Sequence, residues 1–130
     1  MSIEISIHDG PLSPEPHPLC AGKSEAGAVL RFEGVVRGRD GERLIAALGY
    51  ESYEPMASDQ LRALSEEISA KHGLLAMRVR HSRGRVAVGE CSFRLEIAAK
   101  HRKECLAAMD EFIDRMKRDV PIWKRPEWTG

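Results

Sequence analysis

The sequence has no excess of either charge, no long apolar run and no paired cysteines, and each absence excludes a class of protein. Lys plus Arg and Asp plus Glu each number 20 in 130 residues, so no net field attracts the chain to nucleic acid or to an anionic membrane. Every apolar run is far shorter than the roughly 20 residues that span a bilayer. We therefore expect no nucleic-acid or membrane partner, and any electrostatic function must be local.

Cysteine and histidine are too sparse to predict a cross-linked or metal-binding protein. The cysteines are odd in number and form no C-x-x-C pair: Cys20, Cys91 and Cys105. This argues against a disulfide framework and a structural zinc site, and free buried thiols are the simpler interpretation. The histidine spacing matches no metal site, so we expect no metal and no cofactor. Residues 1–10 lack the cationic start and apolar core of a signal peptide, and we expect a cytoplasmic protein.

Hydrophobic periodicity predicts one α+β domain over residues 1–130. Alternating or β-rich runs predict strands at 1–8, 27–37, 44–53, 77–81 and 91–98. Helical spacing predicts helices from Pro55 to Gly73 and from His101 to about Arg118, the second ended by Pro121. We expect a mostly antiparallel sheet with both helices on one face.

Several details of this arrangement can be tested. An Asp-Gly turn within residues 38–43 is expected to fold strand 27–37 back onto 44–53. Residues 11–18 and 82–90 are expected to be loops, and the chain after Pro121 an extended tail. The expected core residues of the second helix are Cys105, Met109, Phe112 and Met116, flanked by Leu106 and Ile113, and Phe32 and Phe93 are also expected in the core.

The segment "MKRDVPIWKRPEW" gathers cations around a proline and a tryptophan at residues 116–128. Lys117 falls in the last turn of the predicted helix, where a cation also complements the helix dipole, so a purely structural role remains open. Lys124 follows apolar residues that should anchor it, and neighbouring cations favour its neutral form, which is the better nucleophile or proton acceptor. The segment predicts a pocket wall that receives an anion.

Two further groups of cations are candidate anion ligands. His101 and Arg102 stand where a strand ends and a helix begins, and helix N-termini offer free N–H groups to anions. The alternative is that they are solvated charges at a helix start. Arg37 lies between Gly34 and Gly38, which allow the backbone to approach a ligand closely, although a lone arginine in a turn has a simple structural explanation.

Five segments, taken in order over nearly the whole chain, resemble the large, catalytic subunit of molybdopterin synthase, the MoaE family. They are "FEGVVRG" (32–38), "LGYESYEPMA" (48–57), "HSRGRVAVGE" (81–90), "AAKHR" (98–102) and "MKRDVPIWKR" (116–125). The resemblance implies an α/β-hammerhead-like fold and a homodimer within a heterotetramer. The implied partner is a small ubiquitin-like sulfur carrier with a C-terminal Gly-Gly thiocarboxylate, and the implied reaction transfers its sulfur to cyclic pyranopterin monophosphate to form the molybdopterin dithiolene.

The resemblance also implies roles for individual residues. Lys117 and Lys124 are the expected catalytic residues. The expected substrate-binding residues are Val35, Val36, Arg37, His101, Arg102, Lys117, Lys124, Arg125 and Pro126. The chain departs from the family pattern at Pro126, often acidic in relatives, at Ala99, commonly Ser, and in ending at Gly130, where relatives usually continue. A carrier-binding protein with weakened catalysis and an unrelated phosphometabolite-binding domain remain the alternatives.

Overall fold

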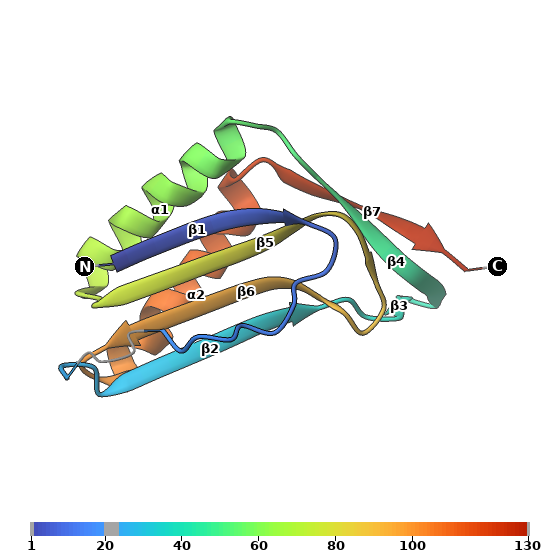
Figure 1. Ribbon diagram of the computed structural model, residues 1–130. Coiled ribbons are helices and arrows are strands. Elements are labelled where there is room, and N and C mark those ends of the chain that lie inside the picture. Colours follow the sequence, from blue (N-terminus) through green and yellow to red (C-terminus); the bar gives the residue numbers. More distant parts are fainter. Residues whose placement is uncertain (1, 20–23, 130) are drawn as a thin grey trace.

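The computed structural model describes residues 2–19 and 24–129 (Figure 1). Its elements are, in chain order, β1 (Ser2–Asp9), β2 (Ala28–Val35), β3 (Arg39–Asp40), β4 (Arg43–Ser52), α1 (Met56–His72), β5 (Ala76–Ala87), β6 (Cys91–Ala99), α2 (Arg102–Asp119) and β7 (Ile122–Trp128). The predicted α+β class is confirmed in this part of the chain. Neither of its two helices has the length and apolar composition required to cross a bilayer.

The strands form one sheet in which β5 is the central element. The order is β2-β6-β5-β4-β3, with β1 added beside β5 and β7 added beside β4. The first half of β5 pairs with β1 and β6, whereas its last residues, Gly84–Ala87, turn away to pair with β4. Only the β1–β5 pairing is parallel among the strands described, so the sheet is mostly antiparallel, as predicted.

The predicted hairpin between residues 27–37 and 44–53 is wrong. β2 pairs with β6, while β4 pairs with β5 and β7. The Asp-Gly turn closes only the short β3–β4 ribbon, where Arg39 pairs with Leu44 and Gly41 adopts a positive φ of 61°. A turn signal fixes only the residues beside it, and β2 instead lies where its apolar residues Ala28 and Leu30 pack into the main core.

Two other segments extend further as strands than predicted. Residues 82–87 continue β5, so the expected loop shrinks to a tight turn at 88–90 that contains Gly89 with a φ of 86°. The expected tail after Pro121 is strand β7, antiparallel to β4. Helix α1 ends as predicted at Gly73, which adopts the left-handed conformation and donates its N–H to the Ser69 carbonyl.

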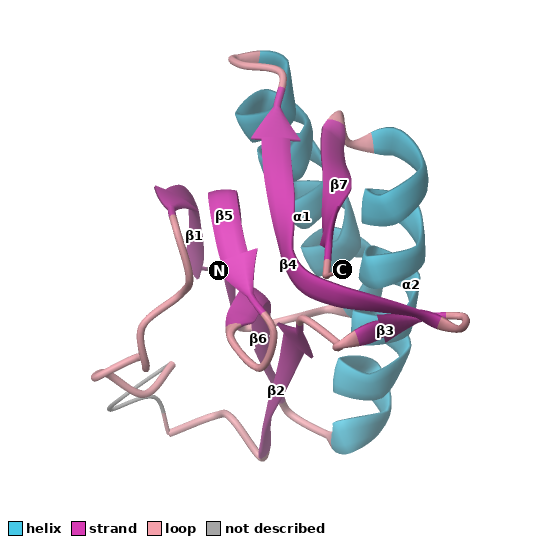
Figure 2. Ribbon diagram, turned by 90° about the vertical axis from the view of Figure 1, so that its right-hand side faces the viewer, coloured by secondary structure: helices cyan, strands magenta, loops and turns pink. Residues whose placement is uncertain are grey.

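The main core lies between the sheet and the two helices, which cover the same face of the sheet (Figure 2). Cys105, Phe112 and Met116 are buried as predicted, and Met109 and Ile113 are partly buried. Two predicted core residues are exposed instead: Leu106 is 53% exposed and Phe32 is 38% exposed. Cys105 is a free buried thiol, as expected, whereas Cys91 is a free thiol that is only partly buried. Cys20 lies outside the described residues.

The opposite face of the sheet carries a network of ion pairs that holds the proline-rich loop. Arg78 and Glu96 are both buried, and Arg78 Nη1 lies 3.1 Å from Glu96 Oε1. The same nitrogen donates to the His17 carbonyl at 2.9 Å, and Arg94 donates to the Ser13 carbonyl at 2.9 Å. Residues 11–18 therefore form a loop, as predicted, and hydrogen bonds from buried arginines help to fix it.

Candidate functional site

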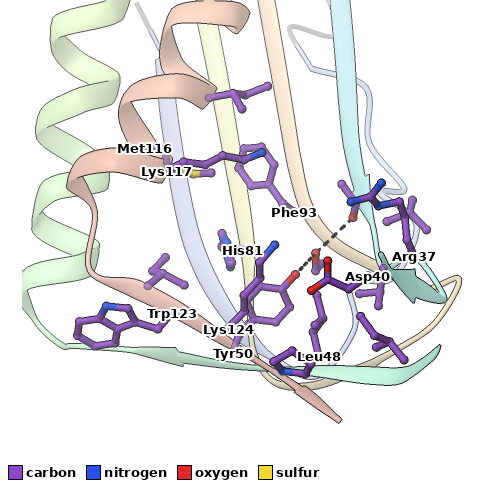
Figure 3. A pocket seen from close by; sticks show the side chains of 18 of the residues that line it. Arg37, Asp40, Leu48, Tyr50, His81, Phe93, Met116, Lys117, Trp123 and Lys124 are labelled. Carbon is purple, nitrogen blue, oxygen red and sulfur yellow. Dashed lines mark hydrogen bonds between the residues drawn. The ribbon is translucent and has the colours of Figure 1, made fainter. Parts of the chain in front are cut away.

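A cavity of about 640 Å³ opens where the helices stop short of the far end of the sheet (Figure 3). Pro121 ends α2, and β7 then runs antiparallel to β4. The cavity lies between the end of α2, the paired strands β4 and β7, and the end of β2. Six of the predicted substrate-binding residues line it: Val35, Val36, Arg37, Lys117, Lys124 and Pro126.

Local geometry decides which cationic side chains reach the cavity. Lys117 stands in the last turn of α2, four residues after Ile113, and both line the cavity because residues four apart share a helix face. Lys124 and Pro126 alternate with Arg125 along β7, and successive strand residues point to opposite faces. Arg125, a predicted binding residue, is not among the lining residues, although Trp123, two residues earlier on the same strand, is.

Four cations of the described chain line the cavity: Lys117, Lys124, Arg37 and Arg39. The first three form what we call the cationic rim. Within residues 2–19 and 24–129, none of them forms an ion pair with a carboxylate. The neighbouring cations on α2 are paired, because Arg118 Nε lies 3.0 Å from Asp119 and Arg115 Nη2 lies 2.6 Å from Glu67. Unpaired cations around a concave surface concentrate positive potential there, so the cavity is suited to an anion.

His101 and Arg102 do not join this rim within one chain. His101 is the N-cap of α2 in an extended conformation, and Arg102 begins the helix. Lys117 follows Arg102 by fifteen residues, a separation of about 22 Å along the helix axis. Both side chains are exposed, and the nearest carboxylate to the His101 ring is that of Glu104, 3.6 Å from Nδ1.

The base of the cavity, which we call the cavity floor, is formed by residues that were not predicted as site residues from the sequence: His81, Tyr50, Ser92 and Phe93. Tyr50 Oη donates to Ser92 Oγ at 2.9 Å, and Ser92 Oγ donates to the Gly34 carbonyl at 3.4 Å. The His81 ring meets the Tyr50 ring edge-on with centroids 5.3 Å apart, and the Phe93 ring at 5.7 Å. His81 continues the buried alternation of Met77 and Val79, which was the available sequence signal.

His81 is held in a defined protonation state. Its Nδ1 lies 2.8 Å from the Ser82 carbonyl, which can only accept, so Nδ1 carries the proton. Burial lowers the pKa of His81, although the bond to the Ser82 carbonyl opposes this shift. The imidazole is therefore neutral near pH 7, with an unprotonated Nε2.

The profile of the family described as "MoaE protein" matches residues 7–119. The chain belongs to the MoaE family. Similar MoaE relatives include two proteins called molybdopterin synthase catalytic subunit. The chain is 38% identical over 98% of its length to the one from Coccidioides immitis and 36% identical over 82% to the one from Bacillus subtilis. It spans 64% and 68% of the length of these relatives.

Solved structures share the MoaE fold. Molybdopterin synthase from Staphylococcus aureus superimposes with a TM-score of 0.79 at 27% identity, covering 98% of this chain and 90% of that one. A complex of subunits 1 and 2 of molybdopterin-converting factor from Helicobacter pylori contains a chain that superimposes with a TM-score of 0.76 at 28% identity, covering 94% and 83%. The family resemblance stated from the sequence is confirmed.

Proposed function

We propose that this MoaE protein is the catalytic subunit of a molybdopterin synthase. It transfers sulfur from the thiocarboxylated C-terminus of a small carrier protein to cyclic pyranopterin monophosphate and so forms the molybdopterin dithiolene. The observation that carries the proposal is the cationic rim, in which Lys117, Lys124 and Arg37 surround one cavity without carboxylate partners among the described residues. Both the substrate phosphate and the carrier thiocarboxylate are anions that need such donors.

Each rim residue has a proposed role. Lys117 contacts the thiocarboxylate and assists proton transfer as sulfur adds to the pterin side chain. Lys124 and Arg37 neutralise the phosphate, since an ammonium and a planar guanidinium both bind phosphate oxygens well. Val35, Val36 and Pro126 line the apolar part of the cavity and exclude water, which strengthens these interactions. Arg125 is a proposed contact outside the cavity.

The proposed assembly is a homodimer that binds one carrier at each end. The similar structure from Helicobacter pylori is a complex of two different subunits, which supports the proposal that this chain also binds a carrier subunit. The exposed edge of β2 supports a dimer: β2 pairs with β6 on one side, no described strand covers its other side, and Val29 and Val35 are each 52% exposed.

A two-fold contact between β2 strands gives His101 and Arg102 a role. Antiparallel pairing puts the start of one β2 beside the end of the other. The start of β2, at Ala28, pairs with Ala99, two residues before His101, and its end leads into Arg37. We therefore propose that His101 and Arg102 of one copy complete the anion pocket of the other.

The free thiols of Cys91 and Cys105 are compatible with a reducing compartment, and we propose the cytoplasm. Reconstitution tests the function directly. The pure protein is mixed with a thiocarboxylated carrier and cyclic pyranopterin monophosphate, and the dithiolene product is detected by fluorescence after oxidation. Product formation is expected. Stable carrier binding without product would instead indicate a binding protein that has lost catalysis, and failure to bind the carrier would favour an unrelated phosphometabolite-binding domain.

A further inference from the structure

His81 has an unused nitrogen that faces the cavity. The residue is 6% exposed, and its Nδ1 is bonded to the Ser82 carbonyl. No residue in the described chain forms a hydrogen bond with Nε2. This atom is not fully enclosed by protein, because the fully enclosed polar atoms without a partner are those of other residues. Its small exposed surface therefore opens into the cavity that His81 lines. An acceptor that is open to the cavity is free to accept a hydrogen bond from a bound ligand.

The rest of the cavity floor also offers acceptors rather than donors. The Tyr50 hydroxyl proton is committed to Ser92 Oγ, and the Ser92 proton to the Gly34 carbonyl. What remains available to a ligand at Tyr50 is the oxygen lone pair. Together with the lone pair of His81 Nε2, it gives the floor two hydrogen-bond acceptors between aromatic rings. The cationic rim, by contrast, offers only hydrogen-bond donors, from Lys117, Lys124 and Arg37.

The geometry points to His81 as a positioning residue that forms a hydrogen bond with the uncharged end of the substrate. A ligand that complements both surfaces carries uncharged N–H donors at one end and an anion at the other. The floor therefore receives the N–H edge of a flat heterocycle, with His81 Nε2 as acceptor, while the rim holds its phosphate. This inference rests on the proposed function, because it orients that substrate in that cavity.

Protonation of His81 would abolish this recognition, because Nε2–H would then oppose a ligand N–H. The other titratable or charged groups that line the cavity are Tyr50 on β4, Lys117 on α2, Lys124 on β7, Arg37 just after β2, and Arg39 and Asp40 on β3. Burial lowers the pKa of His81 and so favours its neutral form, although the hydrogen bond to the Ser82 carbonyl opposes this shift. Ligand affinity should therefore be constant near neutral pH and fall under acidic conditions, as His81 becomes protonated.

The experiment compares binding of cyclic pyranopterin monophosphate and of sulfate to the full-length wild type and to His81→Phe. Phenylalanine keeps a flat ring but removes both nitrogens. The Kd for the pterin should rise about tenfold or more, which corresponds to the loss of one well-placed hydrogen bond. Competition by sulfate, which occupies only the rim, should stay within about twofold, and the acid-dependent loss of pterin affinity should disappear. His8→Phe, on the exposed part of β1, is the matched control and should bind like the wild type.

Each outcome is decisive. A wild type that binds no pterin overturns the proposed function and this inference with it. A wild type that binds, with His81→Phe equal to it, overturns only this inference. If His81→Phe does not fold, the wild type labelled with ¹⁵N-histidine gives the answer: the Nε2 resonance of His81 should move toward a hydrogen-bonded position at saturating pterin but not with sulfate, and an unmoved resonance rejects the assignment.

Discussion

Replacing Lys117 with alanine should reduce sulfur transfer strongly without unfolding the protein. Lys117 is exposed and has no ion-pair partner among the described residues, so its removal should change the free energy of unfolding by no more than about 0.5 kcal/mol. At a partly screened site, a unit charge about 4 Å from an anion contributes roughly 4 kcal/mol. Lys124 and Arg37 remain to compensate in part, so the expected loss in kcat is about 10²- to 10³-fold.

The assay measures dithiolene formation in single-turnover reactions with a saturating thiocarboxylated carrier. Arg118→Ala is the matched control, because Arg118 follows Lys117 on α2 and carries the same charge, yet it pairs with Asp119 and is not among the cavity-lining residues. It should retain wild-type turnover within about twofold. A Lys117→Ala rate within tenfold of wild type, or an equal loss in Arg118→Ala, would refute the role given to the rim.

Three further predictions concern the ion pairs and the assembly. Glu96→Gln should lower the free energy of unfolding by about 2 kcal/mol, because it neutralises the most buried of the three carboxylates that pair with Arg78 and leaves only Glu4 and Glu15. Asp9→Asn, at an exposed pair, should leave the urea midpoint nearly unchanged, and equal shifts in the two variants would contradict this. The pKa of Glu111 is lowered to about 2 by hydrogen bonds from Lys71, His72 and Arg115. Its contribution to stability is therefore present above its ordinary pKa and is lost as pH falls toward about 2. The difference in urea midpoint between wild type and Glu111→Gln should shrink over that range, and a constant difference would contradict this prediction. Co-refolding inactive His101→Ala with inactive Lys117→Ala should restore about a quarter of the wild-type rate, since half of the dimers are mixed and each has one intact pocket; no recovery would mean that both residues act within one chain.

Local patterns in the sequence determined both helices and most strands of this fold, whereas strand β7 was expected to be a tail. Gly73 ends α1 because only a residue that tolerates a left-handed backbone fits there, and Pro121 ends α2 because it cannot continue the helical hydrogen bonds. Lys117, Lys124 and Arg37 were predicted as an anion pocket from residue type and from a family resemblance, and they do line one cavity. These features depend on neighbours in the sequence or on a motif that the chain retains.

Strand partners were decided only by tertiary structure. The Asp-Gly turn suggested that β2 pairs with β4. The choice of partner depends instead on which apolar faces meet across the whole sheet, and β2 lies beside β6, where Ala28 and Leu30 pack against the main core. The separation of His101 and Arg102 from Lys117, by contrast, follows from the predicted helix, because residues at its two ends lie about 22 Å apart along the axis. Proximity across a folded sheet is a property of packing and is not encoded in any short segment.

The cavity floor illustrates the same division. The sequence places His81 in a stripe of core residues, where a histidine is simply one more buried side chain. Only the fold shows that His81 lies beside a cavity that the helices do not fill. It also shows that His81 Nδ1 bonds to the Ser82 carbonyl, while Nε2 faces the cavity beside Tyr50. The sequence thus determined which groups are present, and the tertiary structure decided which of them lack a partner and can therefore bind a ligand.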